Sequence, residues 1–131
     1  MKLCPCGSGL HYSSCCGVHI EGGTPACTPE ALMRSRYTAY TMAKIAYIKK
    51  TMRGKALSGF NPGEAKRWAR RVEWVGLRVL KVVSDSENQG FVEFVASFRD
   101  SGVLQSIHEM SEFERAEGVW YYVDGINRMR Q

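Results

Sequence analysis

Hydrophobic and polar residues alternate with a period of two through the second half of the chain, from Val72 onward. Four segments are rich in Val, Phe, Trp and Tyr, and short turn sequences at 86–90, 100–102 and 117–118 separate them. Alternation of this kind is typical of strands with one buried face. The sequence therefore predicts an antiparallel meander of four strands, over residues 74–84, 90–99, 104–115 and 119–125.

The segment before the strands has helical periodicity instead. Residues 28–30, Thr-Pro-Glu, supply an N-cap, a proline for the first turn and an acid that favours a helix N-terminus. Apolar residues then recur at helical spacing, which predicts a helix running into the 40s. Residues 46–52 form either a second short helix or its frayed end, and 64–71 form a short basic helix after the breaker "GFNPG". Helices followed by a meander indicate an α+β fold with helices on one face of the sheet.

Composition narrows the class of protein. The 131 residues amount to about one ordinary domain, and 44 % hydrophobic with 24 % charged residues is typical of soluble globular proteins. No run approaches the roughly 18 apolar residues of a membrane span. The N-terminus lacks the apolar segment of a signal peptide, so we predict a cytoplasmic protein, whose thiols stay reduced.

Four of the five cysteines lie within "CPCGSGLHYSSCC", residues 4–16. A disulfide framework would leave one cysteine over, and neither close pair can bridge within itself without strain. A catalytic thiol activated by His11 or His19 would need only one sulfur. We therefore favour a third interpretation, metal binding, which involves all four.

The spacing suits a metal site. Two cysteine pairs separated by eight residues can wrap one tetrahedral zinc ion, and Gly7 and Gly9 give the loop the backbone freedom that it needs. A fifth ligand would exceed tetrahedral coordination, so we expect Cys27 to stay free. The predicted ligands of this single structural zinc are Cys4, Cys6, Cys15 and Cys16.

The pattern C-P-C-G-S-G followed by C-C resembles the SEC-C motif. The motif also occurs at the carboxy-terminal end of the preprotein translocase motor SecA, where it contacts the export chaperone SecB and ribosomes. "PEALMRSRYTAY" (29–40), "FVEFVASF" (91–98) and "HEMSEFERAEGVWYYVDG" (108–125) resemble the bacterial YchJ family.

That family joins a SEC-C motif to a nuclear transport factor 2-like domain. The resemblance implies a SEC-C zinc module over 1–22 and a nuclear transport factor 2-like domain over 27–131. It also implies a curved sheet that often leaves a cone-shaped pocket and that can form a homodimer through its outer face.

Such a pocket is a second candidate site. Trp120, Tyr122 and Asp124 are expected on one strand face, with Glu109 on the neighbouring strand, and arginines of the first helix are natural partners for the carboxylates. The alternative is that these arginine–carboxylate pairs only fix the helix against the sheet. The candidate pocket residues are Arg34, Arg36, Glu109, Trp120, Tyr122 and Asp124.

Charge is concentrated in the helical part of the chain. Residues 34–71 contain eleven Lys or Arg and one acid, a net charge of +10. Basic side chains around a tryptophan suit phosphate contacts and base stacking, although a solvated face next to an acidic sheet explains the same charges. The candidate polyanion-binding residues are Lys66, Arg67, Trp68, Arg70 and Arg71.

Two classes of function remain. A site with four cysteine ligands has no open position for a substrate, so we favour a zinc-binding, non-enzymatic interaction module over an enzyme. It would dock on proteins or ribosomal RNA through the SEC-C motif and the basic helical face. The alternative is an enzyme or small-molecule binder that uses the cone-shaped pocket.

Overall fold

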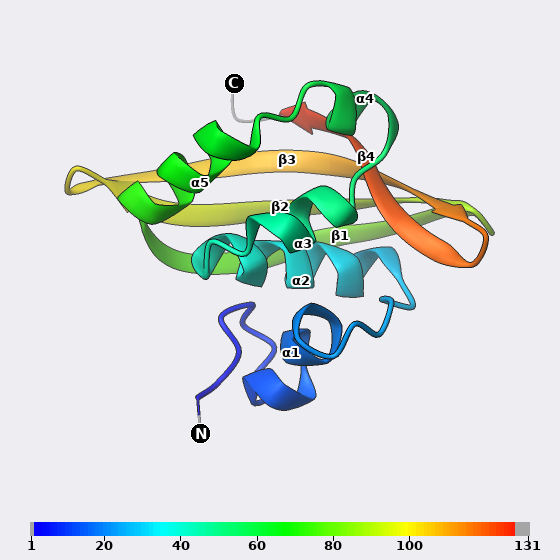
Figure 1. The fold of residues 1–131 in the computed structure, drawn as a ribbon, viewed down its shortest axis with the longest axis horizontal. Helices are drawn as coiled ribbons and strands as arrows, with labels where there is room; N and C mark the ends of the chain where they lie inside the picture. The colour runs from blue at the N-terminus through cyan, green and yellow to red at the C-terminus, as the bar shows by residue number, and fades with distance from the viewer. Residues whose placement is uncertain (1, 128–131) are drawn as a thin grey trace.

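The computed structural model describes residues 2–127 and has an α+β fold in which the helices lie on one face of a four-stranded antiparallel sheet (Figure 1). Neighbouring strands follow the chain order, so the predicted meander is confirmed. Every observed strand boundary lies within two residues of its predicted position. The strands are β1 (Glu73–Ser86), β2 (Gln89–Asp100), β3 (Val103–Ala116) and β4 (Val119–Asn127).

Two tight turns set how β2 pairs with β3 and how β3 pairs with β4. Ser101 and Gly102 connect β2 to β3 with φ angles of 54° and 81°, and Glu117 and Gly118 connect β3 to β4 with 52° and 80°. Two successive positive φ angles are those of a type I′ turn, whose twist matches that of a β-hairpin. Glycine at the second position adopts this conformation at little cost, so the dipeptides direct each strand straight back onto its neighbour.

The helices begin largely where the sequence predicts. Helix α2 (Pro29–Thr41) is capped by Thr28, whose side chain accepts a hydrogen bond from the Ala31 amide, 3.1 Å away. Residues after it form a separate short helix rather than a frayed end, and α5 is capped by Asn61. Helix α4 was not predicted. The remaining helices of this region are α3 (Ile45–Lys50), α4 (Gly54–Ser58) and α5 (Pro62–Arg71).

The N-terminal segment packs against α2, on the side away from α5 (Figure 1, blue). It contains a 3₁₀ turn, η1 (Tyr12–Ser14), and α1 (Cys16–Ile20). The Gly-rich connector after α1 is tied back to it, because the Thr24 amide donates to the Val18 carbonyl over 3.2 Å and the His19 ring lies 2.7 Å from the Thr24 carbonyl oxygen. These contacts hold the connector on α1, and the packing of α1 against α2 holds the segment on the domain.

The main core lies between α2 and the inner face of the sheet. Leu32 of α2 and Phe113 of β3 are almost fully buried there, because the apolar stripe of the helix faces the alternating apolar positions of the strands. The buried residues of this cluster are Ala26, Leu32, Met33, Tyr37, Val92, Phe94, Ala96, Phe113 and Trp120.

A bulge in β4 changes which side chains share a face. Phe113 pairs with Tyr122 but Glu112 pairs with Asp124, so Val123 is an extra residue in β4. Beyond it the alternation is reversed, and Asp124 points to the opposite face from Tyr122. The prediction that these two residues share a face was wrong for this reason.

Several apolar side chains of β1 stay exposed, among them Val75, Leu80 and Val82. The homodimer expected through the outer face of the sheet stays a prediction. Within residues 2–127, no helix is both long and apolar enough to cross a membrane.

Candidate metal centre

A short antiparallel loop carries the first cysteine pair. Leu3 and His11 form an isolated bridge, and the Cys4 amide donates to the Leu10 carbonyl over 2.8 Å. Gly7 and Gly9, inside this loop, have φ angles of 83° and 85°. A residue with a Cβ rarely adopts these angles, so the glycines allow the loop to turn both sulfurs to one side.

The second cysteine pair stands at the start of α1. Gly17, the next residue, lies directly against Tyr12: a Cβ on Gly17 would stand 2.7 Å from the Tyr12 carbonyl oxygen and 2.9 Å from its ring. Only glycine fits this contact. The close approach of Gly17 and Tyr12 brings the start of α1 back onto the N-terminal loop, which places the second pair opposite the first.

The four sulfurs form one compact group. The Sγ atoms of Cys4, Cys6, Cys15 and Cys16 all lie within 4.8 Å of one another. Cys6 and Cys15 are 3.7 Å apart, and Cys15 and Cys16 are 4.0 Å apart. A tetrahedral ion with metal–sulfur bonds of about 2.3 Å would separate its ligands by about 3.8 Å. The four cysteines are therefore positioned to bind one metal ion, whereas Cys27 is exposed and outside the cluster.

Hydrogen bonding prepares the cluster for a cation. A hydrogen bond with Cys16 lowers the pKa of the Cys6 thiol to about 4, against the opposing effect of burial, and Ser8 adds to this lowering. The same hydrogen bond raises the pKa of Cys16. Metal ligation requires thiolates, and the lowered pKa of Cys6 favours that form at this position.

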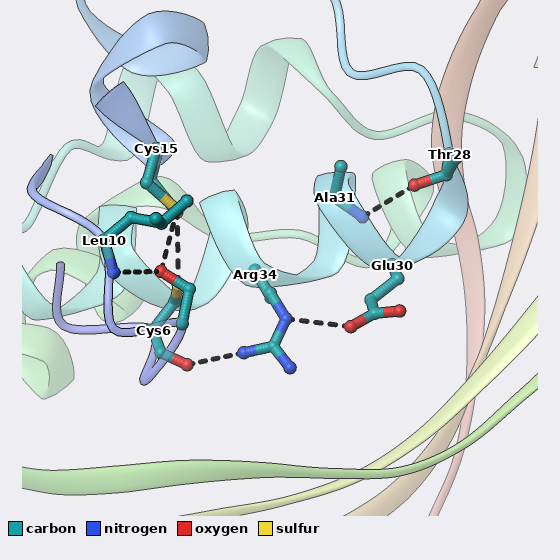
Figure 2. A network of polar contacts seen from close by, with 9 residues as sticks. Cys6, Leu10, Cys15, Thr28, Glu30, Ala31 and Arg34 are labelled. Carbon is teal, nitrogen blue, oxygen red and sulfur yellow. Dashed lines mark hydrogen bonds and ion pairs between the residues drawn. The ribbon is translucent and has the colours of Figure 1, made fainter. Parts of the chain in front are cut away.

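Helix α2 supplies an outer layer of contacts to this group. The Thr38 hydroxyl donates to Sγ of Cys16 over 3.3 Å and lies 3.6 Å from Sγ of Cys4. Arg34 donates from Nη1 to the Cys6 carbonyl oxygen over 2.8 Å, and from Nε to the Glu30 carboxylate over 3.0 Å (Figure 2). Outer contacts of this kind orient metal ligands.

The sequence analysis missed this role for Arg34 and Thr38. Their spacing of four residues places them on one face of α2, which is a detectable signal. The residues that this face contacts lie 22 to 34 positions earlier in the chain, and no local sequence pattern identifies them. Arg34 was instead assigned to the pocket.

Only some of the candidate pocket residues lie at one cavity. Arg36, Glu109 and Tyr122 line a cavity between α2 and the sheet. Arg34 is engaged at the cysteine loop, and Trp120 is buried in the main core.

Asp124 is turned away by the bulge and pairs with Lys55 over 3.9 Å. The expected pairs of Arg34 or Arg36 with Glu109 or Asp124 are absent from the residues that the structure describes.

Some of the candidate polyanion-binding residues are exposed, whereas others contact residues of the protein itself. Lys66, Arg67 and Arg70 are exposed on α5, and Arg71 is held by Asp100 through two hydrogen bonds of 3.1 and 3.0 Å. The ring of Trp68 packs edge-on against three aromatic rings, those of Tyr40, Trp74 and Phe98. These contacts favour a structural role for Trp68 on the inner side of α5, and its use in base stacking stays a prediction.

Comparisons with known proteins agree with this architecture. The family model for the middle, NTF2-like domain of YchJ matches residues 28–125. The UPF0225 protein GSU1048 of Geobacter sulfurreducens is 40 % identical over 126 residues, which cover 95 % of this chain and 78 % of that protein.

Two solved structures of SEC-C motif containing proteins are also similar. One, from Rhodopseudomonas palustris, has a TM-score of 0.86 at 40 % identity, covering 94 % of this chain and 96 % of that one. The other, from Psychrobacter arcticus, has a TM-score of 0.81 at 30 % identity, covering 98 % of this chain and 84 % of that one. A SEC-C cysteine cluster built onto an NTF2-like domain is the arrangement of the YchJ (UPF0225) family, and the chain belongs to that family.

Proposed function

We propose that the protein is a zinc-stabilised interaction module that docks on a protein partner through the surface around its cysteine cluster. The observation that carries the proposal is the set of four cysteine sulfurs within 4.8 Å of one another, which is the number of ligands that a tetrahedral zinc site needs. An all-thiolate tetrahedral site is typical of structural zinc, and it leaves no position for a substrate. The bound ion would supply folding energy to a loop that has little core of its own.

The surface of this module offers apolar contacts. Leu3 is 63 % exposed, Leu10 is 53 % exposed and Val18 is 37 % exposed, although the segment is short. Exposed apolar side chains on a rigid, metal-held loop present contact area at a small entropic cost. These side chains support docking on a protein more than on RNA, since Trp68 is packed internally and Arg71 is paired with Asp100.

Capture experiments with matched variants test the proposal. The immobilised protein, a Leu3→Ser/Leu10→Ser variant and a Val103→Ser/Leu104→Ser control are incubated with cell extract, each with and without a chelator. Val103 and Leu104 are 58 % and 63 % exposed at the start of β3, so the control removes the same kind of surface outside the N-terminal segment.

The proposal expects specific proteins that are lost in the first variant and after chelation but are kept by the control. Equal capture by all forms would contradict it. Binding that is nuclease-sensitive, falls steeply with salt and is lost in Lys66→Glu/Arg67→Glu/Arg70→Glu would instead show that the partner is RNA.

A further inference from the structure

A cavity of about 160 Å³ lies between α2, α5 and the inner face of the sheet, separate from the cysteine cluster. Its walls are mostly aromatic. An engineered apolar cavity of about 150 Å³ holds one benzene molecule, so this one has room for a single six-membered ring. The aromatic residues that line it are Tyr37, Tyr40, Trp68, Trp74, Phe94, Phe113 and Tyr122.

A carboxylate stands at one side of this cavity. Oε2 of Glu109 accepts hydrogen bonds from the Ser111 hydroxyl over 2.7 Å and from the Tyr122 hydroxyl over 3.0 Å. Both bonds reach the same oxygen. Among residues 2–127 no donor is hydrogen-bonded to Oε1, so one carboxylate oxygen remains available to a ligand.

The absence of a side chain at Gly125 leaves room for the Glu109 carboxylate. Gly125 of β4 lies beside it, and a Cβ on this residue would collide with Oε2 of Glu109 and with the Tyr122 hydroxyl. Its φ is not in the left-handed region, so the reason for glycine here is room and not backbone conformation. The strand therefore leaves a gap that accommodates the Glu109–Tyr122 pair.

A guanidinium stands at another side. Arg36 is only 7 % exposed, and its Nη1 donates to the Ile48 carbonyl over 2.8 Å and to the Thr51 hydroxyl over 2.7 Å. Its Cζ lies 4.5 Å from the centre of the Tyr122 ring. Within the described residues, its Nε and Nη2 make no hydrogen bond and it forms no ion pair with Glu109.

Two donors of this largely buried guanidinium, Nε and Nη2, are therefore accessible to a ligand, and an acceptor there would stabilise the charge. The two charges in the cavity offset each other without touching. A cationic ligand would be repelled by Arg36, and an anionic ligand would be repelled by Glu109. A neutral group that offers a donor to Glu109 and an acceptor to Arg36 satisfies both.

We propose that this cavity binds a small, neutral, planar ring carrying an amide, either an aromatic carboxamide or a cyclic amide. The ring lies among the aromatic walls, the amide N–H donates to Oε1 of Glu109, and the carbonyl accepts from Arg36. This inference rests on the cavity alone and does not depend on the metal-centred function proposed above.

Four one-ring probes separate the possible ligand classes. Benzamide carries both donor and acceptor, benzoate only the acceptor, benzamidine only the donor, and toluene neither. Each is titrated through the millimolar range while the three tryptophan indole N–H signals are followed by NMR. Trp68 and Trp74 line the cavity, and Trp120, which does not, is the internal control.

The proposal expects saturable shifts of the Trp68 and Trp74 signals with benzamide, and weaker binding of the other three probes. Glu109→Gln replaces a charged acceptor with a neutral one and should weaken benzamide binding about tenfold. Glu114→Gln, an exposed glutamate on the same strand, is the matched control and should leave it unchanged.

Three results would overturn the assignment. They are no saturable shift with benzamide in the folded wild-type protein, equal binding of benzamide and toluene, or tighter binding of benzamidine or benzoate. The folded state of each variant is checked in the same spectra, so loss of the fold cannot be mistaken for loss of binding.

Discussion

The hydroxyl of Thr38 donates a hydrogen bond to the sulfur of Cys16 over 3.3 Å, although the two residues are 22 positions apart in the chain. Thr38 is completely buried, and Cys16 is 1 % exposed. The NTF2-like domain thus contributes directly to the surroundings of the SEC-C cysteines. The metal centre is a property of both parts of the chain, and not of the cysteine loop alone.

Removing this hydroxyl should weaken metal binding. Thr38→Val keeps the shape of the side chain but leaves Sγ of Cys16 without its donor, and the loss of an outer contact costs about tenfold to a hundredfold in metal affinity. Competition with a chromophoric chelator measures the change. Thr41→Val, on the same helix but bonded only to the Thr38 carbonyl, is the control and should keep wild-type affinity. Equal affinities for both variants would argue against a role for Thr38.

Arg34 should stabilise the contact between α2 and the cysteine loop. Arg34→Gln removes the 2.8 Å bond to the Cys6 carbonyl and the ion pair with Glu30, and should lower the free energy of unfolding by about 1–2 kcal/mol. Faster amide exchange in residues 4–10 should accompany this loss. Arg70→Gln, at an exposed position, should change stability by less than about 0.5 kcal/mol. If residues 4–10 keep their wild-type amide protection in Arg34→Gln, the result would contradict this role of Arg34.

Chelation should affect the two parts of the chain differently. The main core contains no residue of the proposed 1–22 module, so β2 and β3 should keep their amide protection when metal is removed. Residues 2–22 should lose theirs, because the thiolates would no longer hold the loop together. Hydrogen exchange with and without chelator measures both. Unfolding of the whole sheet would show that the module and the 27–131 domain are a single cooperative unit.

Trp68 should matter for stability and not for polyanion binding. Its ring lies 5.0 Å from that of Trp74 and 5.4 Å from that of Phe98, so Trp68→Ala should cost about 3 kcal/mol of unfolding free energy. Denaturant unfolding measures this loss. Lys66→Glu on the same helix is exposed and should leave stability nearly unchanged. A small effect of Trp68→Ala would mean that the ring is free to stack on bases after all.

Local patterns were enough to predict the strands and the cysteine cluster. Turn dipeptides such as Glu117-Gly118 determine where the chain reverses between two strands. Four cysteines within thirteen residues are close together in space because the chain between them is short. Both signals act over short stretches of chain, so no knowledge of the tertiary fold was needed.

Contacts distant in sequence were not predictable in this way. The extra residue Val123 reverses the face of Asp124, and alternation counted along β4 cannot detect it. Helix periodicity placed Arg34 and Arg36 on α2, but the direction that each takes depends on where the cysteine loop and α3 dock. The internal position of Trp68 likewise depends on how α5 meets the sheet.

The central claim is that Cys4, Cys6, Cys15 and Cys16 together hold one zinc ion, and metal analysis of three purified forms tests it most directly. The wild-type protein and a Cys27→Ser control should each contain one zinc per chain, since Cys27 lies outside the cluster. Cys15→Ser/Cys16→Ser should contain none, because two ligands cannot hold a structural ion. Full retention of zinc in the double variant, or its loss in Cys27→Ser, would contradict the account.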